Sequence, residues 1–256
     1  MQRISLIGSG NVASNLGLEL QNKGYEIKDV WSRTQDSAQV LAEKLNANWT
    51  TKINELENVD LFIVTVKDDA IKNIISKIKN KDIPIVHTSG SVGIDILKGH
   101  SLHGVFYPIQ SFNKNVLTSF RDVPICIESN NKKMEKSLYN IANTISSSVH
   151  LINSDQRSKI HLSAVFACNF TNHMIAISET LLEENNIEFE LLHPLISHTL
   201  QKSIKYSARK SQTGPAIRND QKTIQKHLQM IKQKPELSNI YSTITNHIIL
   251  SLSKNK

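Results

Sequence analysis

The sequence predicts an α/β protein in which a doubly wound, parallel sheet is followed by a second domain made only of helices. Up to about residue 152, short apolar segments alternate with stretches of helical periodicity, which is the pattern of strands joined by crossover helices. From Ser154 onward the periodicity is helical, and no strand-like alternation persists. We therefore expect two domains, residues 1–152 and residues 153–256, without a long linker between them.

The chain opens with a strand, a glycine turn and a helix. Ile4–Ile7 is a short apolar run typical of a buried parallel strand. Apolar residues then recur at helical spacing from Val12 to a stop at Lys23-Gly24. The turn between them reads G-x-G-x-x-A, and its last position, Ala13, is small enough to let the helix pack closely on the strand.

This turn is a candidate dinucleotide site. The first glycine permits a tight turn, and the second lets a pyrophosphate approach the backbone. Unpaired amide groups at the helix start would hold the phosphates, helped by the helix dipole. The alternative is an ordinary turn between strand and helix. The predicted cofactor ligands of a Rossmann-like domain are Gly8, Ser9, Gly10, Asn11 and Val12.

The end of the second strand, Glu26–Trp31, predicts which dinucleotide binds. An acidic residue at this point would take the ribose 2′-hydroxyl of NAD, whereas an arginine suits the 2′-phosphate of NADP. The strand is followed by Ser32-Arg33-Thr34, in which two hydroxyls flank a guanidinium. We predict NADP, with an exposed Arg33 and a Thr34 cap on the next helix, 35–45, as the alternative.

Two further strands, Asp60–Val66 and Ile83–His87, are predicted to end at the same edge of the sheet. Asp68 or Asp69 is placed to cap the helix that follows the first of them. Small hydroxyl residues and a glycine after the second would let a nicotinamide ring lie close to the backbone. The predicted cofactor contacts here are Val66, His87, Ser89 and Gly90, and the remaining strands are predicted at 102–106, 125–128 and 149–152, with a helix at 132–144.

The C-terminal half is predicted to consist of helices at 154–184, 190–208, 221–233 and 235–252. The first is apolar on nearly every face between Leu162 and Leu182, so we expect it to be buried on most sides. A rigid turn begins at Thr213-Gly214-Pro215, and Asp220 is placed to cap the third helix.

Composition limits the classes of function. The net charge is +7, but Lys and Arg form no dense basic run, so we expect no nucleic-acid partner. No apolar run approaches the roughly 20 residues of a membrane span, and the first residues enter a strand directly, so we expect a cytoplasmic protein without a membrane partner. We predict that Cys126 and Cys168 are buried free thiols. No histidine or cysteine spacing predicts a metal site.

Candidates for proton transfer come from the first helix of the second domain. At 100° per residue, Lys159, His161 and Asn169 fall at about 0°, 200° and 280°, so only one of the two basic residues can share a cleft with Asn169. A His and an Asn on so apolar a helix need buried partners. The alternative is a structural pair. Arg218 could clamp a carboxylate or phosphate, or pair on the surface.

The chain resembles a family of uncharacterised bacterial NADP oxidoreductases with a Rossmann-like N-terminal domain and a helical C-terminal domain of unknown function. That family is related to pyrroline-5-carboxylate reductase, the F420-dependent NADP reductases and the 6-phosphogluconate dehydrogenase class. The stretches that carry the resemblance are Gly8-Ser-Gly-Asn-Val-Ala13, Ser32-Arg33-Thr34, His87-Thr-Ser-Gly90, Tyr107-Pro108-Ile-Gln-Ser-Phe112, His161 through Asn169-Phe170, and Thr213-Gly-Pro-Ala-Ile-Arg218-Asn-Asp220.

The resemblance implies a Rossmann domain with additional strands, a 6-phosphogluconate-dehydrogenase-like helical domain and, often, a dimer built through that domain. Two departures stand out. Many relatives carry His-Pro where this chain has Tyr107-Pro108, and the related hydroxyacid dehydrogenases carry a lysine where this chain has Val165.

We therefore predict an NADP-dependent oxidoreductase that acts on a C=O or C=N bond of a small, anionic metabolite. The alternative is an NADP-binding sensor without turnover. The predicted catalytic residues are His161, Asn169 and Tyr107, and the predicted substrate ligands are Thr213 and Arg218. Because the first C-terminal helix is too apolar for its few neighbours to cover, we predict a homodimer through residues 154–208 and the last helix.

Overall fold

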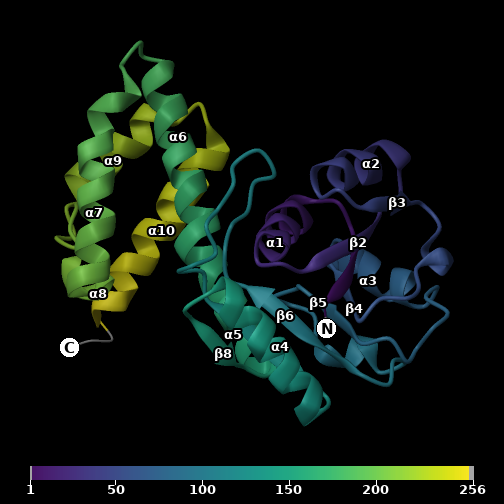
Figure 1. Ribbon diagram of the computed structural model, residues 1–256. Helices are drawn as coiled ribbons and strands as arrows, with labels where there is room; N and C mark the ends of the chain where they lie inside the picture. The colour runs from purple at the N-terminus through teal and green to yellow at the C-terminus, as the bar shows by residue number, and fades with distance from the viewer. Residues whose placement is uncertain (1, 254–256) are drawn as a thin grey trace. The chain divides into compact units, whose positions relative to one another are not determined.

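The computed structural model describes residues 2–253 and shows an eight-stranded sheet with the order β3-β2-β1-β4-β5-β6-β7-β8 (Figure 1). The chain starts in the middle, winds outward to β3, and returns to the other side of β1 at β4. Ligands of doubly wound sheets bind at such a reversal, outside the carboxyl ends of the strands. The strands are β1 (Arg3–Ile7), β2 (Glu26–Trp31), β3 (Asn48–Thr50), β4 (Leu61–Val64), β5 (Ile85–His87), β6 (His103–Pro108), β7 (Ile125–Ser129) and β8 (Val149–Leu151).

Helices cover both faces of this sheet, and each face has its own apolar core. One core joins β1 and β2 to α1 (Asn11–Asn22), α2 (Gln35–Lys44) and α4 (Lys132–Ile145). The other joins β1, β4 and β5 to α3 (Asp68–Ile75) and two short 3₁₀ turns, Ile53–Glu55 and Ile94–Leu97. Leu6 packs in the first core and Ile7 in the second, because successive side chains of a strand point to opposite faces. The predicted α/β class is confirmed.

Two details of the sheet differ from the prediction. β7 pairs antiparallel with β6, with Tyr107 opposite Cys126, because no crossover helix lies in the connection between them. The short strand β3 was not predicted, since Asn48–Thr50 lacks the apolar pattern of a buried strand and lies at the sheet edge.

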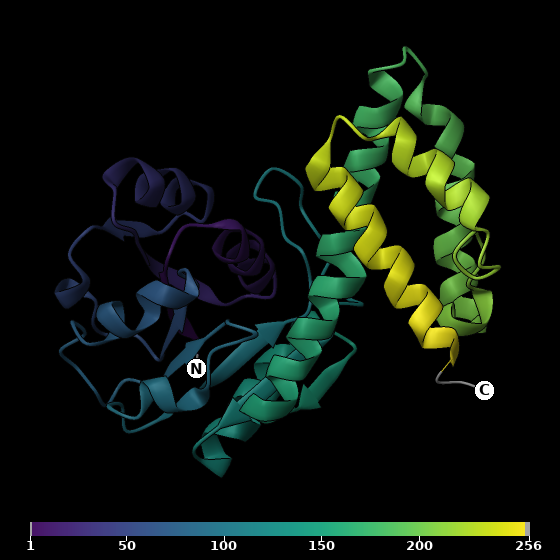
Figure 2. The ribbon, with the colours of Figure 1, turned by 180° about the vertical axis from the view of Figure 1, so that it is seen from behind.

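The chain divides into two compact units, residues 1–174 and 175–256. The strands end at Leu151, as the change of periodicity indicates, yet the first unit continues through α5 (Ser154–Ala164). The second unit is helical and contains most of α6 (Thr171–Glu183). The last helix, α10, runs along this unit (Figure 2). Its other elements are a 3₁₀ turn (Phe189–Leu192), α7 (His193–Tyr206), α8 (Ala208–Ser211), α9 (Gln221–Met230) and α10 (Pro235–Ser253).

The helix predicted at 154–184 is continuous but not uniform, because Val165–Phe170 forms a π-helical segment between α5 and α6. Its apolar side chains are not buried as predicted. Leu162 and Phe166 are 59% and 62% exposed, since nothing in the described part of the single chain covers this face. By length and composition alone, Ser154–Glu183 could cross a membrane. Cys168, on the π segment, is also exposed rather than buried, whereas Cys126 is buried, and both thiols are free.

Candidate functional site

The glycine turn after β1 is shaped for a close approach to the next strand. Gly8 has a φ of +126°, and a Cβ atom at this position would lie 2.5 Å from Oγ1 of Thr65, just beyond β4. Only glycine fits such a turn. α1 begins with Gly10 as its N-cap, and no side chain caps it. Its first amide groups are therefore available to an anion, as the dinucleotide prediction requires.

A cleft of about 710 Å³ opens beside this turn, at the carboxyl ends of β1, β2 and β4. It brings together seven predicted cofactor ligands from three separate segments, which are Gly8–Gly10, Ser32–Thr34 and Val66. It also contains residues that were not predicted to be in the site, among them Trp31, Ser37, Thr65 and Asn73. A cleft at the reversal of a doubly wound sheet is where a dinucleotide binds.

The hydroxyl groups around Arg33 form a connected set. Ser9 Oγ donates to Ser32 Oγ at 3.0 Å, which ties the glycine turn to the end of β2. Thr34 Oγ1 donates to Ser37 Oγ at 2.9 Å. Thr34 is the N-cap residue of α2, but its side chain makes no capping hydrogen bond. The alternative role predicted for Thr34, a cap on α2, is therefore wrong. Arg33 is exposed and lines the cleft, where its guanidinium can meet a ligand.

Two predicted cofactor ligands have other partners. Asn11 Oδ1 accepts a hydrogen bond from the backbone amide of Lys114 at 3.1 Å, so this side chain holds a loop. Ser89 Oγ accepts from the amides of Ser91 and Val92 at 3.2 and 3.0 Å and thereby closes the turn after β5. Asp68 was proposed as a helix cap, but it is the first residue of α3, and its carboxylate accepts from Ser91 Oγ.

His87 is fully buried, so it has no exposed atom with which to touch a cofactor. Its Nδ1 accepts from the amide of Ser89 at 3.2 Å, which places the ring proton on Nε2. Burial and, to a smaller extent, the positive charge of Arg157 lower the pKa of His87 to about 4. The ring is therefore neutral at physiological pH and supports the turn that carries Gly90.

Tyr107 and His161 meet over Gly90. The hydroxyl of Tyr107 lies 3.1 Å from His161 Nδ1, and the two rings are edge-to-face with centroids 6.1 Å apart. A Cβ atom on Gly90 would lie 2.6 Å from His161 Nδ1 and 2.8 Å from Tyr107 Cζ. Three predicted site residues from β6, α5 and the turn after β5 are thus in direct contact. Burial, together with the nearby Cys126, raises the pKa of Tyr107, so its hydroxyl stays protonated.

A buried arginine anchors the helix that carries His161. Arg157 is fully buried one turn before His161, and its guanidinium binds Glu128 Oε2 and the carbonyl of Val92, both at 2.5 Å. Ser154 Oγ donates to the same carboxylate at 2.7 Å. Such a buried ion pair is costly to break, because one charge is then left without a partner. It fixes α5 against β7 and therefore sets the position of His161.

Arg157 was not among the residues predicted from the sequence to be in the site. The signal was available, because residues four apart lie on the same face of a helix, and position 157 is therefore on the same side as His161. Glu128 ends a predicted strand, but no role was predicted for its carboxylate.

The remaining predicted residues lie elsewhere. Asn169 is exposed near the end of the π segment. A π turn contains about one residue more than an α turn, which changes the angular position of the following residues around the helix axis by about 100°. Asn169 therefore lies closer to the face of His161 than α-helical geometry predicts. Lys159 pairs with Asp155 at 2.7 Å on the surface. Thr213 and Arg218 are exposed on a loop of the second unit, and their role at the substrate stays a prediction, whereas Asp220 caps α9 as predicted.

The fold and the cleft together define a dinucleotide-binding α/β protein. Residues 3–97 match the family described as NADP oxidoreductase coenzyme F420-dependent, and residues 123–248 match a domain of unknown function (DUF2520). A crystal structure from Bacteroides fragilis, described as a putative NADP oxidoreductase, is 38% identical, with 97% of this chain and 98% of that chain covered and a TM-score of 0.90. The chain therefore belongs to this family of NADP oxidoreductases, as the resemblance implied.

More distant structures share the fold. A reductive aminase from Aspergillus terreus, in complex with NADPH and ethyl levulinate, is 12% identical, covers 99% of this chain and 94% of its own, and has a TM-score of 0.75. A 1-pyrroline-5-carboxylate reductase from Streptococcus pyogenes is 14% identical, covers 96% of this chain and 98% of its own, and has a TM-score of 0.63. No curated protein matches the chain.

Proposed function

We propose that the protein is an NADP-dependent reductase of a C=O or C=N bond in a small, anionic metabolite. The observation that carries this proposal is the contact of Tyr107 and His161 over Gly90. In this proposal the pair donates the proton, and it lies at the same edge of the sheet as the cleft proposed to bind the dinucleotide.

The residues present fit the cofactor. Gly8–Gly10 and the uncapped start of α1 suit the pyrophosphate, and Ser32-Arg33-Thr34 suits a 2′-phosphate. No acidic residue follows β2 directly to bind a ribose 2′-hydroxyl. When bound, NADPH would supply the hydride that reduces the substrate carbon. The protein must then supply a proton to the oxygen or nitrogen of the same bond.

Both arrangements of the hydrogen bond between Tyr107 and His161 leave one proton to donate. If Tyr107 donates to Nδ1, the imidazole carries its other proton on Nε2. If Nδ1–H donates to the hydroxyl oxygen, the hydroxyl proton is free. The raised pKa of Tyr107 keeps this donor protonated in either case. In this proposal His161 passes a proton to the hydroxyl of Tyr107 through their hydrogen bond.

Two lines of support narrow the substrate class. The related folds include a reductive aminase and a 1-pyrroline-5-carboxylate reductase, which supports a C=N bond. The net charge of +7, with Arg218 exposed on its loop, supports an anionic substrate. In this proposal Arg218 and Thr213 hold the anionic group, and Asn169 orients the reacting oxygen or nitrogen.

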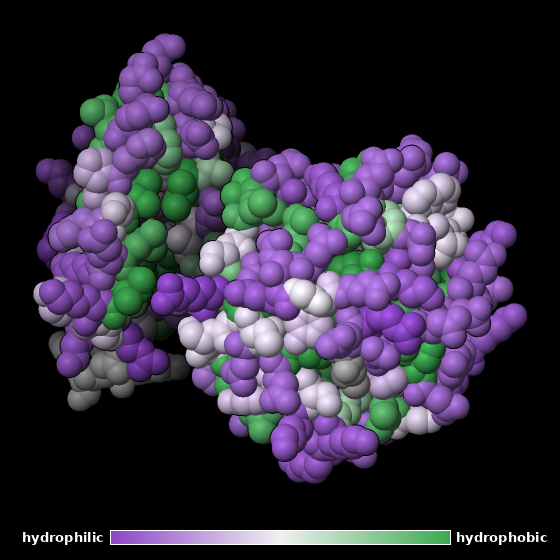
Figure 3. All heavy atoms as spheres, in the orientation of Figure 1, coloured by the Kyte–Doolittle hydropathy of each residue, from purple (hydrophilic) through white to green (hydrophobic). Residues whose placement is uncertain are grey.

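A second copy of the chain completes the proposal. Leu162, Phe166 and Phe170 are 59%, 62% and 48% exposed at four-residue intervals, so they share one face of the helix. Apolar side chains also gather on the helical unit (Figure 3). Soluble monomers rarely expose large contiguous apolar patches. A homodimer through this helix and the last one would bury them.

The direct test follows NADPH absorbance with 1-pyrroline-5-carboxylate, 2-oxo acids, and ethyl levulinate with an amine. Steady oxidation with any of them, lost in the double variant Tyr107→Phe/His161→Ala, is the expected result. Tyr139→Phe, which removes an exposed hydroxyl on α4, is the matched control. Tight NADPH binding without turnover would instead support the sensor function.

A further inference from the structure

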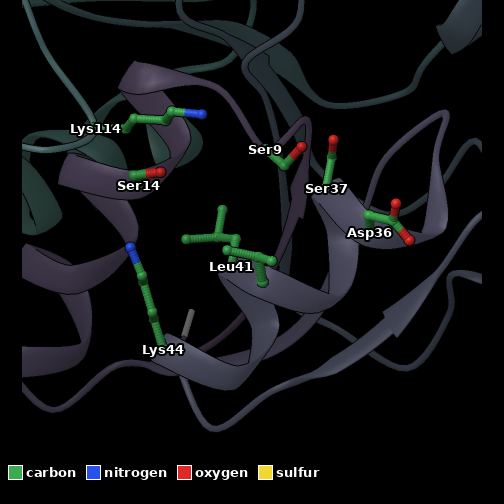
Figure 4. A pocket seen from close by; sticks show the side chains of 8 residues that line it. Ser9, Ser14, Asp36, Ser37, Leu41, Lys44 and Lys114 are labelled. Carbon is green, nitrogen blue, oxygen red and sulfur yellow. The ribbon is translucent and has the colours of Figure 1, made fainter.

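A second, smaller pocket lies beside the nucleotide cleft, between α1, α2 and the loop that contains Lys114. Its volume is about 210 Å³, and it shares Ser9 and Ser37 with the nucleotide cleft. The side chains that line it are Ser9, Ser14, Asp36, Ser37, Val40, Leu41, Lys44 and Lys114 (Figure 4). Nothing in the glycine motif or in the Ser32-Arg33-Thr34 sequence predicts its two lysines.

The loop that carries Lys114 is fixed on the start of α1. Asn15 is only 3% exposed, and its amide donates to the carbonyl of Asn113 at 3.1 Å, while its Oδ1 accepts from the amide of Thr118 at 3.1 Å. Asn11 accepts from the amide of Lys114 itself. These bonds join segments about a hundred residues apart, so they hold the backbone of Lys114 beside the glycine turn.

A tight turn sharpens this placement. The amide of Val116 donates to the carbonyl of Asn113 at 3.1 Å, and Asn113 Oδ1 accepts from the amide of Asn115 at 2.9 Å. Lys114 is therefore the first central residue of a closed turn. A backbone held on both sides leaves only the side chain of Lys114 to adjust.

The pocket has the chemistry of a phosphate site. Lys114 comes from the loop and Lys44 from the last turn of α2, and Figure 4 shows them on either side of Ser14. Within residues 2–253, neither ammonium group has an ion-pair partner. Serine hydroxyls and ammonium groups are the donors that phosphate oxygens accept from. The one carboxylate, Asp36, lies at the opposite end of the pocket from the lysines in Figure 4.

We propose that this pocket, through Lys114 and Lys44, binds the phosphate monoester on the ribose of NADP from the side opposite to Arg33. The inference rests on the proposed cofactor. Ser9 and Ser37 line both the pocket and the nucleotide cleft, so a group bound between them faces Arg33 on one side and the lysines on the other. Two cations from separate segments would make the preference for NADP depend on the loop, and not on the end of β2 alone.

The test is calorimetric titration of the full-length protein with NADPH, NADH and inorganic phosphate. For Lys114→Ala we expect NADPH affinity to fall about five- to tenfold, and for Lys44→Ala/Lys114→Ala more than tenfold, while NADH affinity changes less than twofold. Lys136→Ala, an exposed lysine on α4, is the matched control and should leave both affinities unchanged.

Three outcomes would overturn the inference. Equal losses for NADPH and NADH would mean that the lysines do not recognise the 2′-phosphate. Unchanged NADPH affinity in the lysine variants would also reject it. The same holds if these variants abolish the binding of inorganic phosphate but leave the affinity for NADPH unchanged, because the pocket would then bind a different phosphate. If the wild type itself fails to prefer NADPH, the proposed cofactor is wrong. If Arg33→Ala removes the preference and the lysine variants do not, only this inference fails.

Discussion

The hydroxyl of Tyr107 lies 3.1 Å from Nδ1 of His161, and this contact joins the end of β6 to the first helix after the sheet. Both side chains rest on Gly90, which has no side chain to separate them. Arg157 and Glu128 hold the same helix one turn earlier. The pair is therefore positioned by the first compact unit alone, before any residue of the second unit contributes.

We predict that Tyr107→Phe and His161→Ala each lower kcat on the order of a hundredfold, as the loss of a general acid typically does. NADPH affinity should stay within about twofold, because neither residue lines the nucleotide cleft. Stopped-flow turnover and calorimetry measure the two quantities. If either variant keeps full turnover, that residue is not the donor, and if thermal unfolding shifts strongly, a structural role explains the loss.

The glycine under this pair offers a sharper test. In Gly90→Ala, the new methyl group would lie under 3.0 Å from both rings, so the pair must move apart. We expect a loss of turnover on the order of tenfold or more. Gly99→Ala is the control, because nothing lies within 4 Å of a Cβ atom there. Equal activity of the two variants would show that the contact is not needed.

The residues of this site could be named from the sequence, but their contacts could not. Gly90, Tyr107 and His161 each follow a predicted strand or lie on a predicted helix, so chain order placed them near one sheet edge. Their mutual contact depends on how α5 docks, and that docking is set by the ion pair of Arg157 with Glu128. A periodic pattern of apolar residues does not predict which distant residue will pair with a buried charge.

Predictions that rested on regular helix geometry were the least secure. Asn169 was placed by counting 100° per residue, but the π segment changes the phase before that count ends. The same helix was expected to be buried because it is apolar, yet its apolar face is open in the single chain. Apolar periodicity shows that a face needs a partner and does not show which molecule supplies it.

Arg33 should contribute to the preference for NADPH over NADH. We predict that the wild type binds NADPH at least tenfold more tightly than NADH, about 1.4 kcal/mol, because a guanidinium forms charge-assisted bonds to phosphate. Arg33→Ala should reduce that difference. Calorimetry with both cofactors measures it, and Arg121→Ala, another exposed arginine, serves as the control. Equal affinities in the wild type would contradict the NADP assignment.

Stability should fall in mild acid because two buried histidines resist protonation. Burial lowers the pKa of both His87 and His100 from 6.5 to about 4. Between these pH values the unfolded chain binds more protons than the folded one, so acidification favours unfolding. As the pH falls from 6.5 to 4, each histidine lowers the free energy of unfolding by at most about 3 kcal/mol. Above pH 6.5 neither histidine makes the free energy of unfolding depend on pH.

Thermal unfolding from pH 7.5 to 4 measures this effect. The variants His87→Asn and His100→Asn should each flatten the dependence of Tm on pH between 6.5 and 4. His173→Gln, an exposed histidine on α6, should leave it unchanged. A slope that both buried-site variants leave intact would place the acid sensitivity in other groups, such as Asp60, whose pKa is lowered by hydrogen bonds from the backbone amides of Gln2 and Arg3.

The last prediction concerns the apolar face of the long helix. Phe166 and Phe170 stack edge-to-face with centroids 5.0 Å apart and remain 62% and 48% exposed, so a second copy would remove a large aromatic area from water. We expect a dimer by light scattering at micromolar concentration. Phe166→Asp should give a folded monomer, because association would bury an unpaired carboxylate. Leu151→Asp, which changes an exposed apolar residue on β8, is the control and should stay dimeric. A monomeric wild type would leave this face without its proposed partner and would reject the dimer.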